Sequence, residues 1–163
     1  MAEKQNFFGN QNMVMQKNPV VDAYNLGVHE EWEVGLVADT DLNNSAKTFT
    51  VPSGQEWEIW GVWAEFTSVT GSTRQLAIDI LDTEDNVIGR CLAGTAQAAS
   101  LAYKYYFGLH VDQMYGVLAN YYQDRLIFMR VSAGETIKVW DANECGVDAD
   151  DLIVRMKYLF RYV

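Results

Sequence analysis

The chain has 163 residues, of which 49% are hydrophobic and 13% aromatic, and its formal net charge at pH 7 is −10. This length and apolar content suffice for one domain with a hydrophobic core. An acidic chain without clustered Lys and Arg is a poor general binder of nucleic acid, because phosphate contacts need such clusters. No segment approaches the length of a membrane span, and the start, MAEKQNFFGNQ, lacks the basic and apolar regions of a secretory signal. We expect a globular protein that is used without translocation and binds neither nucleic acid nor membrane.

The first 31 residues differ in composition from the rest of the chain. Asn and Gln dominate their polar residues, and their apolar residues come in small clusters. Neither a helical nor a strand period persists, yet the apolar content is high for a disordered tail. We predict an extended N-terminal arm over residues 1–31 that lies on its own domain or on a neighbouring subunit. Its expected partner-binding residues are Phe7, Phe8, Met13, Val14 and Met15.

After a first short strand at 32–37 and another at 48–51, the sequence reaches its most informative stretch, residues 55–82. This stretch reads as two long strands joined by a tight turn. The run 57–69 contains three Trp as well as Phe, Ile and Val, and no Pro, a composition that favours a strand. Gly71 can adopt the positive φ that a hairpin connection often needs. We therefore predict that the two strands form a hairpin.

The two strands of this predicted hairpin differ in their faces. The second alternates, which indicates one buried face, with Leu76, Ile78 and Ile80 on one side and Gln75, Ala77 and Asp79 on the other. The first is apolar on both faces, with Trp57, Ile59 and Trp63 on one and Trp60, Val62, Ala64 and Phe66 on the other. Such a strand is either central, with loops or the arm on its second face, or it meets another protein. On the second interpretation, Trp60 and Phe66 contact the partner.

The remaining strand signals are apolar or aromatic runs bounded by turn residues. A turn at 82–86 leads into a strand at 87–92 that pairs back, and residues 110–122 have no sustained pattern. Further strands are predicted at 101–107, 125–131, 136–140 and 152–163. About eight strands without a convincing amphipathic helix predict an all-β fold, an antiparallel β-sandwich of jelly-roll type, over residues 32–163. Its predicted core contains Leu76, Ile78, Ile80, Ile137, Val139, Val154 and Met156.

Signals for chemistry are weak. The loop at 141–151 holds oxygen ligands that suit Ca²⁺, but it lacks the Gly and terminal Glu of an EF-hand loop, and Asp is a common turn former. Its acidic residues are Asp141, Glu144, Asp148, Asp150 and Asp151. His29 and His110 have no second ligand at zinc spacing, and neither a Gly-x-Ser-x-Gly motif nor a phosphate-binding Gly-rich loop occurs. We predict no catalytic, cofactor or metal site.

Cys91 and Cys145 are expected to be reduced and buried, although a bridge between them is compatible with the sequence.

Several segments, in this order, resemble small β-sandwich proteins of tailed-bacteriophage virions. The segments are VPSGQEWEIWGVWAEFT, GSTRQLAIDILDTEDNVIG, AGTAQAAS, VSAGETIKVWDAN and VDADDLIVRMKYLF. In those phage proteins a Pro-x-Gly-x-x-Trp strand is followed by Gly-x-x-Arg-Gln-Leu, an Ala/Gly-Gln linker, an Ala-Gly-x-x-Ile-x-Val-x-Asp strand and an Asp-Asp pair. The resemblance covers roughly the C-terminal two-thirds, and its motifs are structural rather than catalytic. Arg74, in the GSTRQL segment, is positioned to pair with the acidic loop at 141–151 and hold two strand ends together.

The resemblance implies a non-enzymatic virion protein, foremost a capsid decoration (cement) protein that binds the major capsid protein and stabilises the phage head. The doubly apolar strand at 57–66 and the N-terminal arm predict a homo-oligomer or a larger assembly, and the resemblance suggests a trimer. The protein would be made in the host cytoplasm and act at the capsid surface. The alternatives are a component of the tail or head–tail connector, or a virion glycan-binding module that uses exposed Trp and Tyr.

Overall fold

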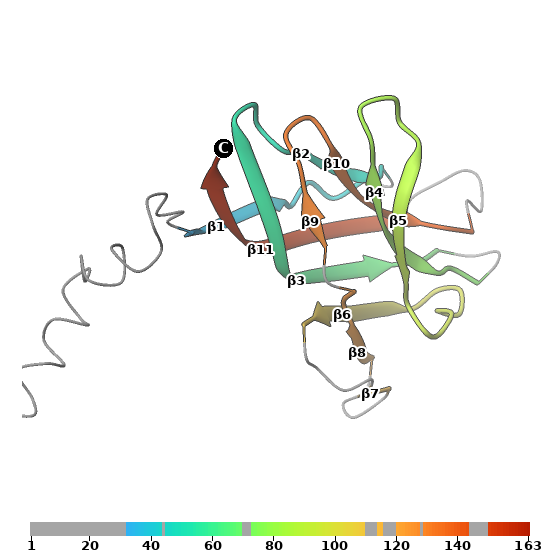
Figure 1. The fold of residues 1–163 in the computed structure, drawn as a ribbon. Coiled ribbons are helices and arrows are strands. Elements are labelled where there is room, and N and C mark those ends of the chain that lie inside the picture. Colours follow the sequence, from blue (N-terminus) through green and yellow to red (C-terminus); the bar gives the residue numbers. More distant parts are fainter. Residues whose placement is uncertain are drawn as a thin grey trace, which may run out of the picture. The chain divides into compact units, whose positions relative to one another are not determined.

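Strands make up all of the regular structure in the computed structural model, which describes residues 32–43, 45–69, 73–109, 114–115, 120–127, 129–143 and 150–163. The strands form two mostly antiparallel sheets that pack face to face (Figure 1). The predicted all-β fold of two packed sheets is therefore confirmed, and the jelly-roll type stays a prediction. The expected arm, with Phe7, Phe8, Met13, Val14 and Met15, lies outside the described residues. No helix long and apolar enough to cross a membrane occurs in the described ranges.

The larger sheet is built around two long strands. In order across the sheet, its strands are β1 (Glu33–Asp39), β11 (Asp151–Tyr162), β3 (Gln55–Thr67), β6 (Ala102–Gly108), β8 (Tyr121–Arg125) and β7 (Met114–Tyr115). A short strand, β9 (Arg130–Val131), also pairs with β3. Neighbours run antiparallel, except that β6 and β8 are parallel. The two longest strands, β3 and β11, thus pair near the middle of the sheet, and we call this pair the β3–β11 spine.

The smaller sheet covers one face of the larger one. Its order is β2 (Lys47–Thr50), β10 (Thr136–Asp141), β4 (Leu76–Leu81) and β5 (Val87–Leu92), and all neighbours are antiparallel. The turn at 82–86 joins β4 and β5 as predicted, because Asp82 Oδ1 accepts hydrogen bonds from the backbone N–H groups of Glu84 and Asn86 at 2.9 and 2.8 Å.

The core between the sheets contains every residue predicted for it. Leu76, Ile78, Ile80, Ile137, Val139, Val154 and Met156 are each at most 4% exposed. They pack with residues of the larger sheet such as Ile59, Val62 and Phe107. Period-two alternation identified these positions because each strand presents alternate residues to the opposite sheet.

The predicted hairpin between the strands at 57–69 and 76–81 is wrong. Strand β3 lies in the larger sheet between β11 and β6, whereas β4 lies in the smaller sheet between β10 and β5 (Figure 1). The chain therefore crosses from one sheet to the other between these strands. Each strand already has two neighbours in its own sheet, and most of them come from distant parts of the chain. A connection containing Gly marks a turn, but it does not say which strands pair.

Two further predictions need correction. The strand predicted at 125–131 is two short strands, because β8 ends at Arg125 and β9 begins at Arg130, and β8 starts inside the stretch predicted to have no pattern. The polar face of β4 is also covered, since Asp79 is only 1% exposed. Asp79 accepts two hydrogen bonds from Arg90, at 2.7 and 2.8 Å, and one from Trp140 Nε1 at 2.8 Å.

Candidate functional site

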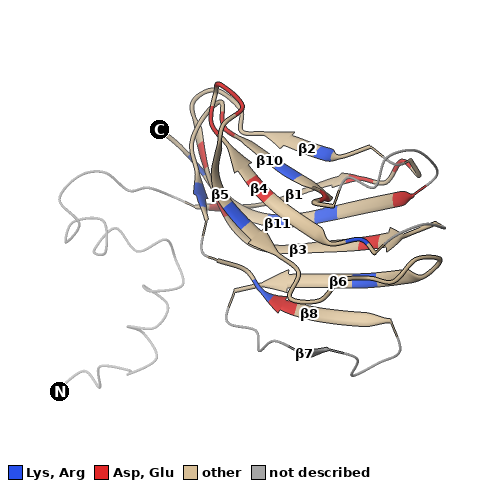
Figure 2. Cartoon of the chain, turned by 90° about the vertical axis from the view of Figure 1, so that its right-hand side faces the viewer, with Lys and Arg blue, Asp and Glu red and all other residues tan. Residues whose placement is uncertain are grey.

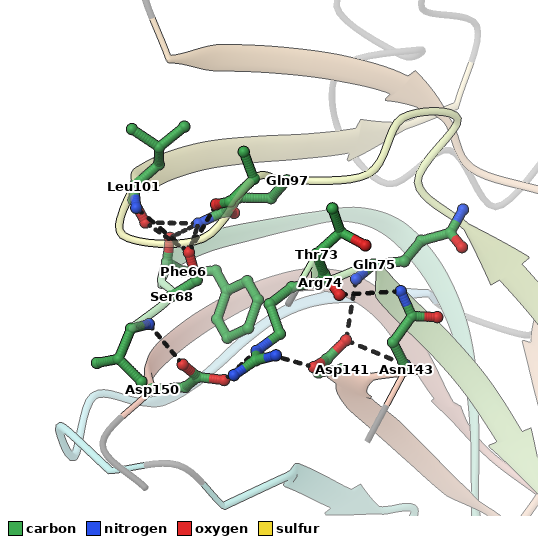
Figure 3. Close-up of polar contacts among 12 residues, drawn as sticks. Phe66, Ser68, Thr73, Arg74, Gln75, Gln97, Leu101, Asp141, Asn143 and Asp150 are labelled. Atoms are coloured by element: carbon green, nitrogen blue, oxygen red, sulfur yellow. Dashed lines mark hydrogen bonds and ion pairs between the residues drawn. The ribbon is translucent and has the colours of Figure 1, made fainter. Parts of the chain in front are cut away.

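Arg74 lies buried at the point where the chain crosses between the sheets (Figure 3). Its Nε donates to Asp150 Oδ2 over 2.6 Å and lies 3.4 Å from Asp141 Oδ2. The same two carboxylates accept backbone N–H groups, Asp150 from Val69 at 2.8 Å and Asp141 from Gln75 at 2.9 Å. The predicted pairing of Arg74 with the acidic loop is confirmed. It fastens the end of β10 and the start of β11 to the entry of β4.

The pairing with Arg74 bears on the Ca²⁺ interpretation of the loop. Asp141 and Asp150 both contact the Arg74 guanidinium, and each also accepts a backbone N–H group, so donors of the protein already occupy these candidate Ca²⁺ ligands. Glu144 and Asp148 lie outside the described residues, as do His29, His110 and Cys145. In the part of the chain that the structure describes, no group of three or more His, Cys, Asp or Glu is arranged to hold a metal ion. Cys91 is buried with a free thiol.

Gln97 extends the buried network toward β6. Its backbone exchanges two 2.8 Å hydrogen bonds with Arg74, and its Nε2 donates to the carbonyl oxygens of Phe66 and Leu101 at 3.0 and 2.6 Å (Figure 3). Tyr105 Oη donates to Gln97 Oε1 over 3.0 Å. Burial raises the pKa of Tyr105 well above its ordinary value, because the phenolate would be desolvated. These contacts join the crossover to the larger sheet and make the network structural.

Lys47 is a second buried cation, only 1% exposed on strand β2. Its Nζ donates to Asp39 Oδ1 at 3.0 Å, to the Asp41 carbonyl oxygen at 2.8 Å and to Asn43 Oδ1 at 3.0 Å. The hydrogen bond from Lys47 lowers the pKa of Asp39. Lys47 Nζ thus supplies hydrogen-bond donors to the loop between β1 and β2, so its role, like that of Arg74, is structural.

A β-bulge in β3 determines which aromatic residues reach the surface. Tyr158 of β11 is opposite Ile59, but Lys157 is opposite Gly61, so Trp60 is an extra residue on β3. A bulge places two consecutive residues on one face and shifts the alternation that follows. Trp57 and Ile59 before the bulge therefore point to the same core as the residues that follow it, Val62, Ala64 and Phe66.

The bulge corrects the predicted faces of this strand. A strict period of two predicted that Trp57 and Trp63 share one face and that Trp60 and Phe66 share the other. Instead, Trp57 and Phe66 are 4% and 2% exposed in the core, whereas Trp60 is 43% exposed and Trp63 is half-buried. Of the two partner-binding residues predicted on this strand, Trp60 is accessible and Phe66 is not. The strand is thus apolar on both faces because Trp60 and Trp63 lie on the outer face, the face of the larger sheet that points away from the smaller sheet.

A groove of about 270 Å³ lies on this outer face. It is lined by Leu36, Trp60, Gly61, Trp63, Tyr106, Arg155, Met156 and Lys157, and we call it the aromatic groove. Its residues come from β1, β3, β6 and β11. Gly61 allows the ring of Tyr106 to lie close to the sheet, since a Cβ at this position would be 3.2 Å from Tyr106 Oη. The bulge and this glycine together shape the groove.

Cations border the aromatic groove. The Arg155 guanidinium lies 4.6 Å from the centre of the Trp63 ring, and Lys157 Nζ lies 5.9 Å from that of Trp60. Further along β11, Arg161 lies over Trp32 at 4.8 Å and bonds Glu56 at 2.6 Å. Arg155 and Lys157 form no ion pair with a carboxylate within the described residues. Figure 2 shows basic positions along β11 and β6 in a chain that is acidic overall.

Arg155, Lys157 and Arg161 share one face of β11, because a strand presents every second residue on the same side, but their aromatic neighbours come from other segments of the chain. Leu36 and Tyr106 give no local signal of a site, because only the order of strands brings them to Trp60. The aromatic groove combines apolar rings with two cations that no described carboxylate neutralises, a composition that suits contact with a protein surface. No protein-family model, curated protein or solved structure matches the chain.

Proposed function

We propose that this protein is a non-enzymatic structural protein of a phage virion, a decoration protein that binds the major capsid protein and braces the head. The order of motifs that resembles small virion β-sandwich proteins supports this proposal. The structural observation that favours it most is the outer face of the larger sheet, where Trp60 and Trp63 lie beside Arg155 and Lys157. Trp, Tyr and Arg are the residue types that contribute most to protein interfaces.

The mechanical role follows from a rigid body with an adhesive surface. A cement protein resists the outward pressure of packaged DNA by bridging neighbouring capsid subunits, which requires stiffness rather than a reactive pocket. The long β3–β11 spine and the buried Arg74 network provide stiffness. The aromatic groove provides one contact, and the predicted arm over residues 1–31 provides another. Burial of each large apolar side chain contributes about 1.5–3 kcal/mol before ordering costs.

Repetition over the capsid strengthens a modest contact. Many copies acting together, or a homo-oligomer with several grooves, convert weak binding into durable attachment through avidity. The net charge of −10 suits the outer surface of the shell, away from packaged DNA. The basic rim of the groove suits an acidic patch on the capsid protein.

Particles that lack this protein test the proposal. They should assemble but release DNA on heating or chelation of divalent ions, and added protein should restore them. A Trp60→Ala, Arg155→Ala variant should restore them poorly, whereas Ile88→Ala, an exposed change on β5, should act as wild type. Depleted particles that are equally robust but fail to adsorb to cells would instead place the protein in receptor binding.

The alternatives use the same surface for other partners. A tail or head–tail connector component would also bind protein through the groove, and localisation of the protein in the virion by electron microscopy distinguishes these positions. A glycan-binding module needs open aromatic rings for stacking on sugars. Because the Arg155 guanidinium lies over the Trp63 ring, this ring is not an open platform, which favours a protein partner. Binding to host polysaccharides that is abolished by Trp60→Ala would support the glycan alternative.

A further inference from the structure

Among the strands that the structure describes, β1 lies at one edge of the larger sheet. Along its whole length it pairs with β11, from Glu33 opposite Phe160 to Asp39 opposite Val154. No described strand pairs with its other edge. Such an edge presents a row of backbone N–H and C=O groups that are able to pair with a strand from another chain.

The sequence of β1 does not protect this edge. Its five central residues, VGLVA, contain neither charge nor Pro, and Val34 and Leu36 are 61% and 77% exposed. The edges of the smaller sheet differ. Strand β2 has four residues and an inward-pointing Lys47, and β5 has an irregular register opposite Ile80–Leu81 as well as a partly exposed Arg90. Short length, inward charges and bulges are devices that prevent edge pairing, and β1 has none of them.

We propose that a second copy of this chain pairs antiparallel with β1 through a two-fold axis at Gly35. A two-fold axis perpendicular to the sheet makes β1 antiparallel to its own copy, so the same strand supplies both sides of the contact. In this register Val34 is opposite Leu36 of the second copy, and both lie on the outer face. The two large apolar side chains that β1 exposes then cover each other. Glu33 is opposite Val37, so no like charges within β1 face one another.

This pairing joins the two larger sheets into one continuous sheet. Both outer faces then lie on the same side, because the axis is perpendicular to the sheet. Leu36 also lines the aromatic groove, so the two grooves are brought near each other on one surface. If the proposed function holds, the dimer binds its target with two grooves at once. The pairing itself requires only the purified chain, so its test is independent of that function.

Sedimentation velocity of the full chain across a concentration series tests the pairing. We expect a dimer whose dissociation constant rises at least about tenfold in a Val34→Lys, Leu36→Lys variant, because like charges then oppose each other. A Val87→Lys, Ile88→Lys variant adds the same charge to the edge of β5 and should leave the dimer unchanged. Trp60→Ala in the groove should also leave it unchanged. Far-ultraviolet circular dichroism verifies that each variant is folded.

Disulfide trapping tests the register in a Cys145→Ser background. A mixture of Val34→Cys and Leu36→Cys chains should form a cross-linked dimer, whereas a mixture of Val87→Cys and Ile88→Cys chains should not. Efficient self-cross-linking of either single β1 variant would overturn the axis at Gly35. A monomeric full chain would overturn the proposal. If deletion of residues 1–31 turns such a monomer into a dimer, the chain's own N-terminal residues occupy the edge of β1 in the full chain.

Discussion

Arg74 Nε lies 2.6 Å from Asp150 Oδ2 and so links two segments that are 76 residues apart in the chain. Arg74 precedes β4 of the smaller sheet, and Asp150 precedes β11 of the larger one. Both side chains are almost fully buried, at 2% and 13% exposure. The pair therefore holds the sheets together at the crossover rather than at a solvated surface.

Replacing Arg74 with Ala should lower the free energy of unfolding by about 3–5 kcal/mol, because it leaves the buried Asp150 without its cation. Urea denaturation followed by Trp fluorescence measures this loss. Arg155→Ala is the matched control, since Arg155 is exposed and touches Trp63 without a described carboxylate partner, and it should cost about 1 kcal/mol or less. Equal losses in the two variants would contradict a structural role for the Arg74 network.

Tyr105 should make stability depend on alkaline pH. Because burial raises the pKa of Tyr105 above its ordinary value of 10.0, the folded chain keeps the phenolic proton when the unfolded chain loses it. Its stabilising effect is therefore complete below pH 10 and is lost as the pH rises further. In Tyr105→Phe, unfolding free energies from urea titrations at several pH values should fall less steeply above pH 10.

The same variant should also be less stable at neutral pH. Without the hydroxyl, Gln97 Oε1 loses its 3.0 Å donor, which costs about 1–3 kcal/mol for a buried acceptor. If Tyr105→Phe and the wild-type chain lose stability in parallel between pH 10 and 11, another group is responsible for the alkaline transition.

Gly35→Ala should disturb the inner side of β1. A Cβ at Gly35 would overlap the ring of Tyr158, which stacks on Trp57 with 3.9 Å between ring centres. Displacing this ring should cost about 1–3 kcal/mol, as overpacking does in cores, and should change the near-ultraviolet circular dichroism of Trp57. Gly89→Ala is the control, since its Cβ would lie 3.6 Å from Ile80, an ordinary contact. A harmless Gly35→Ala would show that Tyr158 moves freely.

Cys91 should react slowly with thiol reagents in the folded chain. It is 5% exposed, and burial raises the pKa of its thiol, so that little thiolate is present. In a Cys145→Ser background, Ellman's reagent should label Cys91 at least about 100-fold more slowly in buffer than in guanidinium chloride, since labelling requires opening of the core. Equally fast labelling under both conditions would show that the β5 edge opens readily.

Local pattern was sufficient for much of the fold. Alternation in the strands at 76–81, 136–140 and 152–163 identified core residues, because a strand beside a packed sheet must bury every second side chain. The turn residues at 82–86 predicted the β4–β5 hairpin. The opposite charges of Arg74 and the acidic loop at 141–151 predicted that Arg74 pairs with this loop. In each case the physical requirement, burial of apolar surface or neutralisation of a buried charge, is visible in residue type and position.

The amino-acid sequence by itself determined that this chain forms strands and which residues of β4, β10 and β11 enter the core. Only the tertiary structure decided which strands are neighbours, that β3 and β4 belong to different sheets, and that a bulge at Trp60 turns Trp60 and Trp63 outward while Phe66 stays in the core. The same long-range pairing brings Leu36, Tyr106 and Arg155 to one groove. Strand pairing joins backbone groups that are common to all residues, so side-chain pattern specifies a strand's buried face but leaves its partners to the packing of the whole chain.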